Sequence, residues 1–68
     1  MNVRLNGTEH ELRDGATVVD AVVAAAGDAG RRGIAVALEG EVVPRSRWDA
    51  TALADGARVE VLEARQGG

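Results

Sequence analysis

Residues 2–12 read NVRLNGTEHEL. Residues 2–6 alternate polar and apolar side chains, which is the period of a strand with one buried face. Asn6-Gly7 is the preferred pair for a tight type I′ hairpin turn, because both central positions of that turn need a positive φ. Residues 8–12 then return as a second, more polar strand with one face in water. The segment therefore predicts an N-terminal β-hairpin.

A helix is predicted directly after this hairpin. Thr17 resembles a helix N-cap, and Asp20 stands where the partner of a capping box is expected. Two overlapping sets of apolar residues fit helical spacing, which gives a broad apolar stripe: Val18, Val19, Ala21, Val22, Val23, Ala25 and Ala26. Because valine is a poor helix former in isolation, the helix should form by packing across a sheet and end near Gly27.

The second half of the chain predicts three more strands. Residues 34–38 are a continuous apolar run of strand length, and residues 41–43 form a short strand. Residues 45–53 are irregular, with a single helical turn near Trp48. Residues 58–62 alternate cleanly and make the last strand.

The order strand, strand, helix, strand, short strand, strand predicts an α+β fold of the β-grasp (ubiquitin-like) type. We expect a mixed sheet of four to five strands with one main helix packed across it. The domain covers residues 1–62, and residues 63–68 form a flexible C-terminal tail. A chain of 68 residues without Phe or Tyr has a thin core, so it presents a surface or a tail more easily than it encloses a substrate.

Composition argues against several classes of function. Eight basic residues stand against 11 acidic ones, whereas phosphate binding needs a concentrated positive face, so nucleic acid is not expected as a partner. The chain has no cysteine, so any sulfur it carries must sit on something other than a side-chain thiol. No stretch is apolar enough to span a bilayer and no signal-peptide core is present, so we expect no membrane contact and a cytoplasmic location.

The side chains offer no catalytic constellation. His10, placed on the solvent face of the second strand, has no neighbours at ligand spacing, so neither a metal nor a bound cofactor is expected. Trp48 could anchor a partner or cap the core, and packing is favoured. A solvated face is favoured over acid–base chemistry for four glutamates: Glu39, Glu41, Glu60 and Glu63. The sequence therefore predicts a substrate of enzymes rather than an enzyme.

The chain ends in Arg65-Gln66-Gly67-Gly68. Glycine has no Cβ, so a Gly-Gly end can enter a narrow channel, and six extended residues reach at most about 20 Å. The Gly68 carboxylate is a poor electrophile until a partner enzyme converts it with ATP into an acyl-adenylate, from which a sulfur nucleophile can displace AMP. We predict Gly68 as the working group and Arg65, Gln66 and Gly67 as the part of the tail in the partner's channel. Arg65 either pairs with acidic groups there or keeps the tail solvated.

Over essentially its whole length the sequence resembles the ThiS family, the sulfur carrier proteins of thiamin biosynthesis. The matching segments are VRLNG (3–7), GATV (15–18), IAVAL (34–38), GEVVPRSRW (40–48), DGARVEV (55–61) and QGG (66–68). Residues 40–48 are the most discriminating of these. Two features depart from the family pattern: Glu39 stands where an Asn is frequent, and the helix lacks large aliphatic residues.

The resemblance implies that a ThiF-like enzyme adenylates Gly68 and that the carboxylate becomes a thiocarboxylate. A separate protein would donate the sulfur, and a ThiG-like thiazole synthase would accept it. A sulfur carrier of the molybdopterin-synthase small-subunit type is the nearest alternative, and carriers for cysteine synthesis use the same chemistry. A ubiquitin-like modifier of lysines and an interaction module with an idle tail belong to other classes.

Overall fold

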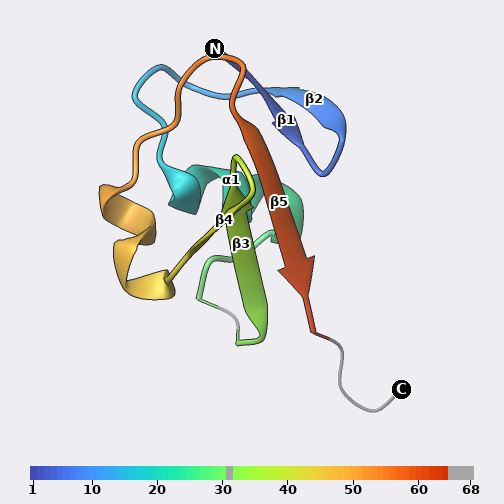
Figure 1. Ribbon diagram of the computed structural model, residues 1–68, viewed down its shortest axis with the longest axis vertical. Helices are drawn as coiled ribbons and strands as arrows, with labels where there is room; N and C mark the ends of the chain where they lie inside the picture. Colours follow the sequence, from blue (N-terminus) through green and yellow to red (C-terminus); the bar gives the residue numbers. More distant parts are fainter. Residues whose placement is uncertain (31, 65–68) are drawn as a thin grey trace.

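Within residues 1–30 and 32–64, which the computed structural model describes, five strands form one mixed sheet (Figure 1). The elements in chain order are β1 (Asn2–Leu5), β2 (Thr8–Glu11), α1 (Val18–Ala26), β3 (Ile34–Leu38), β4 (Glu41–Val43), η1 (Arg45–Ala50) and β5 (Arg58–Glu63). The strands lie side by side in the order β2-β1-β5-β3-β4. Strand β5 pairs parallel with β1 and antiparallel with β3, so the last strand occupies the middle of the sheet. The predicted β-grasp arrangement is confirmed.

The predicted hairpin between β1 and β2 is confirmed as well. Asn6 and Gly7 have φ values of 52° and 82°, both positive as a type I′ turn requires. This two-residue turn places Thr8 directly opposite Leu5 and His10 directly opposite Val3. Residues directly opposite each other share a sheet face, so His10 lies on the face of the buried Val3 and is half-buried. The prediction that His10 lies on the solvent face is therefore wrong.

Helix α1 begins and ends where predicted. The Thr17 amide donates a hydrogen bond of 2.8 Å to the Asp20 carboxylate in a capping box, and Gly27 ends the helix with φ 84°. Val18, Ala21 and Val22 are fully buried, whereas Val23 is 46 % exposed. The face of α1 that carries Val18, Ala21 and Val22 therefore packs against the sheet, and the buried stripe is narrower than the predicted one.

The capping box makes part of the stability pH-dependent. The backbone hydrogen bond from Thr17, helped by Arg13, lowers the pKa of Asp20 below its ordinary value of 3.8. A depressed pKa stabilises the fold at pH values above the ordinary pKa, and the stabilisation is lost as the pH falls through the folded-state value. We expect Asp20→Ala to cost about 1 kcal/mol at pH 7. In urea titrations the difference in the free energy of unfolding between wild type and Asp20→Ala should shrink below pH 4.

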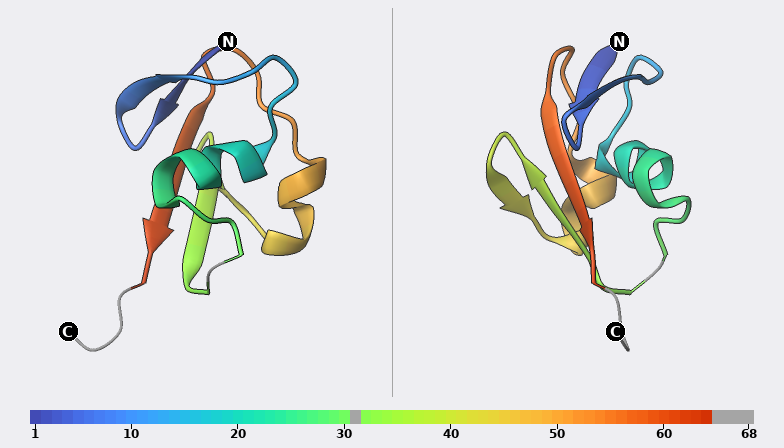
Figure 2. Two further views of the ribbon diagram at one scale, coloured as in Figure 1. Left: turned by 180° about the vertical axis from the view of Figure 1, so that it is seen from behind. Right: turned by 90° about the vertical axis from the view of Figure 1, so that its right-hand side faces the viewer.

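The core lies between the sheet and one covering layer made of α1 and η1 (Figure 2). The segment after β4 is a 3₁₀ helix of six residues, longer than the single turn predicted near Trp48. Trp48 is only 3 % exposed, and its indole Nε1–H donates to the Val43 carbonyl over 2.9 Å. The interpretation of Trp48 as a packing residue is confirmed. Within the described residues, no helix is long and apolar enough to cross a membrane.

Candidate functional site

Strand β5 leads from the centre of the sheet into the chain end. It runs to Glu63, one residue beyond the predicted end, so Glu63 belongs to the strand rather than to the tail. The Ala64 amide then donates a hydrogen bond of 2.7 Å to the Gly33 carbonyl. The predicted site residues Arg65, Gln66, Gly67 and Gly68 lie outside the described residues. The structure defines the position of β5 and Ala64, to which these four residues are attached.

Asn6 supports β5 from the side of β1. The backbone pairing of β1 with β5 covers Arg4 opposite Arg58 and Leu5 opposite Val59, after which β1 turns into the hairpin. The Asn6 carboxamide continues the ladder: its Oδ1 accepts from the Val61 amide at 2.8 Å, and its Nδ2 donates to the Val61 carbonyl at 3.2 Å. An amide side chain offers the same donor and acceptor as a peptide group, so it can replace a missing rung.

Gly33 supports β5 from the side of β3. Its φ is +77°, and a Cβ added there would lie 3.3 Å from the Ala64 Cβ and 3.4 Å from the Ala64 carbonyl oxygen. Contacts this short would require Ala64 to shift by a few tenths of an ångström, so the close approach of the two backbones favours glycine in addition to the positive φ. The sequence of residues 28–33 did not predict this role. The available signal was a glycine placed just before the strand that pairs with the last strand.

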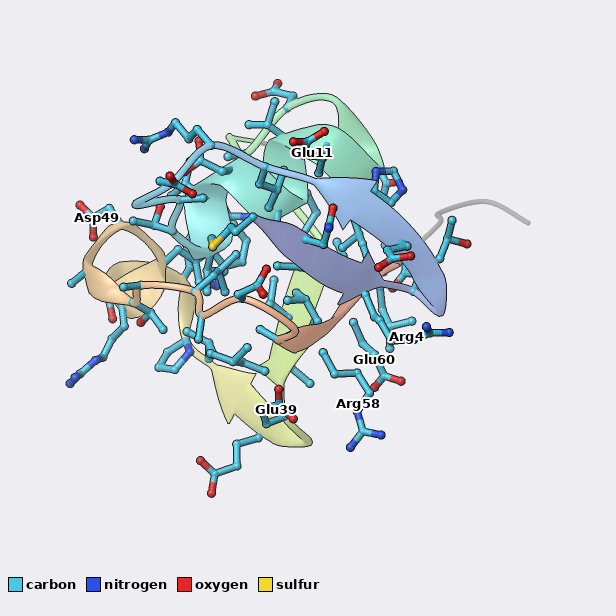
Figure 3. All side chains as sticks on the ribbon, turned by 90° about the horizontal axis from the view of Figure 1, so that it is seen from above. Arg4, Glu11, Glu39, Asp49, Arg58 and Glu60 are labelled. Carbon is cyan, nitrogen blue, oxygen red and sulfur yellow. The ribbon has the colours of Figure 1, made fainter. Side chains whose placement is uncertain are left out.

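The sheet face away from α1 has no covering element in the described part of the chain, as the two views of Figure 2 show. Arg4, Arg58 and Glu60 project from this face (Figure 3). Leu62 and Val42 also lie on it and are 68 % and 78 % exposed, with the small side chains of Ala35 and Ala37 opposite them in the strand register. We call Leu62, Val42, Ala35 and Ala37 the apolar patch. It adjoins the end of β5 that leads into the last four residues.

Among the four glutamates, Glu39 has a structural role, given by its hydrogen bonds to Arg58. Glu39 accepts a hydrogen bond of 2.8 Å from the Arg58 amide, and its own amide donates to the Arg58 carbonyl at 2.9 Å. It thereby tethers the first residue of β5, which accounts for a Glu at a turn position with φ 51°. Glu41 and Glu60 are exposed. Among residues 1–30 and 32–64 there is neither a cluster of metal-ligating side chains nor a pocket.

Comparisons with known proteins identify a family and solved structures that this chain resembles. A sequence model of the ThiS family matches residues 3–68. A crystal structure of the thiamine biosynthesis protein ThiS from Geobacter metallireducens is 33 % identical, with a TM-score of 0.76 and 100 % of both chains covered. An NMR solution structure of a thiamine biosynthesis protein from the same organism is 30 % identical, with a TM-score of 0.77, covering 100 % of this chain and 88 % of that one. The comparison with curated proteins gave no match.

Proposed function

Because the chain belongs to the ThiS family, and is thus a sulfur carrier of thiamin biosynthesis rather than a catalyst, we propose that its reactive group is the Gly68 carboxylate. The observation that carries this proposal is the family match itself, which extends through the terminal Gly67 and Gly68. The placement of β5 adds support, because the central strand of the sheet leads directly into these residues. Partner enzymes then recognise the folded domain and modify the chain end.

The proposed chemistry has two steps on a partner enzyme. A carboxylate oxygen of Gly68 attacks the α-phosphorus of ATP, pyrophosphate leaves, and an acyl-adenylate forms. Hydrosulfide, supplied by a donor protein, then attacks the acyl carbon and displaces AMP, which leaves a thiocarboxylate and releases one proton. The protein itself holds no cofactor in this scheme, since the activating enzyme binds the ATP.

The reach of the chain end restricts where the activating enzyme binds. Four residues follow Ala64, and fully extended they span at most about 14 Å. Any active site that acts on Gly68 therefore lies close to the end of β5. The apolar patch adjoins this end, and exposed apolar side chains gathered on one face are typical of protein–protein contacts. We propose that the ThiF-like enzyme contacts the patch while it adenylates Gly68.

A substitution in the patch should weaken this contact without unfolding the domain. Leu62→Ser should raise the KM of the activating enzyme for the carrier by about 10-fold, the loss expected for one apolar anchor. Its kcat and the melting temperature should change little, because Leu62 is 68 % exposed. Val23→Ser on helix α1 is the matched control, since Val23 is 46 % exposed on the opposite side of the sheet. An equal KM for both variants would contradict the assigned contact.

The adenylation step is tested by isotope exchange between ATP and pyrophosphate. We expect exchange only when the carrier, the ThiF-like enzyme and ATP are all present. Exchange that is independent of the carrier would contradict the proposal.

The pathway is tested by the enzyme that receives the sulfur. Purified thiocarboxylate carrier should support thiazole formation by a ThiG-like synthase. Sulfur transfer to a molybdopterin-synthase large subunit instead would assign the chain to the alternative pathway, and Gly68 found in isopeptide linkage to lysines would indicate a protein modifier.

A further inference from the structure

We propose that Asn6 and Gly33 are positioning residues for the adenylation of Gly68, an inference that rests on the proposed function. They hold β5 from its two sides near its end and so fix the position of Ala64, the last described residue. Asn6, in the turn directly after β1, contacts Val61, and Gly33, directly before β3, contacts Ala64.

The support from Asn6 is specific to its side chain. The Asn6 backbone amide already donates to the Val59 carbonyl at 2.9 Å, which completes the last backbone rung between the two strands. The next rung, at Val61, would lie beyond the point where β1 reverses. Both polar backbone atoms of Val61 on that side are bonded to the Asn6 carboxamide, and both bonds are partly buried. The amide therefore extends the parallel ladder of β1 and β5 towards the chain end.

The support from Gly33 lies on the opposite side of β5. Its carbonyl accepts the Ala64 amide one residue beyond the last strand pair, Ile34 with Glu63. A Cβ at this glycine would lie 3.3 Å from the Ala64 Cβ, so an alanine here would require Ala64 to shift by a few tenths of an ångström. Gly40 has a similar φ of +84° but nothing within 4 Å of its would-be Cβ. The constraint at Gly33 is thus the contact with Ala64 in addition to the backbone torsion.

We expect a displacement of Ala64 to slow the adenylation of Gly68 and to leave the binding of the ThiF-like enzyme unchanged. The Gly68 carboxylate must approach the α-phosphorus of ATP in line, and small misplacements of reacting groups cause large losses in rate. Neither Asn6 nor Gly33 belongs to the apolar patch, so the contact with the activating enzyme remains. The expected signature is a lower kcat at an unchanged KM.

The first test compares Gly33→Ala with Gly40→Ala in steady-state adenylation by the ThiF-like enzyme. Both variants put alanine at a positive φ, so both carry the backbone strain, but only Gly33→Ala meets Ala64. We expect kcat to fall several-fold for Gly33→Ala, with KM within about two-fold of wild type. Gly40→Ala should match wild type in both constants. Equal kcat values for the two variants would overturn the role of Gly33.

The second test uses two substitutions of Asn6. Asn6→Gly keeps the positive φ of the turn but removes both bonds to Val61, and we expect a several-fold lower kcat. Asn6→Asp retains the acceptor for the Val61 amide, so it should recover part of the loss, which a purely local effect on the turn would not produce. Circular dichroism corrects each rate for the folded fraction. A kcat that follows only this fraction would overturn the role of Asn6.

Failure of this inference is distinguishable from failure of the proposed function. If wild type supports carrier-dependent exchange of ATP with pyrophosphate and the variants do so at the rates of their controls, only the positioning roles are overturned. If wild type supports no exchange, both the proposed function and the positioning roles are overturned.

Discussion

Deleting Gly67 and Gly68 abolishes sulfur loading while the free energy of unfolding stays within about 0.5 kcal/mol of wild type. The C-terminal carboxylate then sits two residues closer to β5, on Gln66, and the reach beyond Ala64 falls from about 14 Å to about 7 Å. The truncated chain still ends in a carboxylate, so a loss of sulfur loading would show that the position of the carboxylate matters. Intact mass after incubation with the ThiF-like enzyme, ATP and the sulfur donor measures loading, and urea titration measures stability.

Moving the carboxylate outward should be as damaging as moving it inward. One alanine added after Gly68 shifts the carboxylate by about 3.5 Å and puts a Cβ at a position where the native chain has none. We expect no gain of mass from this variant. One alanine added before Met1, at the other end of the chain, should leave loading unchanged and so serves as the control. Full loading of the truncated or the extended chain would contradict the role of Gly68.

Trp48→Ala should have the largest effect on stability. The side chain is 3 % exposed, and removing a buried aromatic residue costs about 3–5 kcal/mol. A domain of this size has a total stability of roughly 3–10 kcal/mol. We therefore expect the melting temperature to fall by at least about 15 °C, and the variant to be largely unfolded at the warm end of the physiological range. Thermal unfolding followed by circular dichroism measures the change.

Two further variants identify what Trp48 contributes. Trp48→Phe keeps an aromatic ring but leaves the Val43 carbonyl without its indole donor, so it should lose about 1–3 kcal/mol. Val42→Ala removes a nearby side chain that is 78 % exposed, and its effect should be within about 0.5 kcal/mol. A Trp48→Ala protein that melts like wild type but fails to bind the activating enzyme would instead make Trp48 a partner anchor.

The discriminating segment 40–48 has a structural explanation. Arg45 stacks over the Trp48 ring, 4.5 Å from its centroid, and donates a hydrogen bond of 2.6 Å to the Ala29 carbonyl. The indole in turn bonds to Val43 in the edge strand β4. The Arg and Trp of this segment therefore join the loop after α1, the edge strand and the core. Both side chains therefore have a packing role in this domain.

Local signals were sufficient to predict most of the fold. Asn6-Gly7 determines a turn through its own torsions, and Thr17 with Asp20 determines a helix start through one local capping box, so neither needs knowledge of the rest of the chain. The face of His10 was mispredicted because its own strand is polar throughout. Only the register with β1 assigns that face.

The two positioning residues could not be found from sequence for a different reason. The Asn6-Gly7 turn alone explains an asparagine at position 6, so the sequence gives no reason to look for a second role. Its partner Val61 is 55 residues away along the chain. Gly33 precedes β3, and both its φ of +77° and the approach of Ala64 favour glycine there, but neither can be read from the local sequence. Contacts between segments far apart in the sequence decide both roles. The identity of the chain end as a candidate site, in contrast, follows from residues 65–68 themselves.

The most direct test is the mass of the wild-type carrier after incubation with the ThiF-like enzyme, ATP and a sulfur donor, followed by fragmentation of the C-terminal peptide. We predict a gain of about 16 Da, from one oxygen replaced by sulfur, carried entirely by the fragment that contains Gly68. An unchanged mass while the activating enzyme consumes ATP, or a gain located on any other residue, would contradict the role of the Gly68 carboxylate.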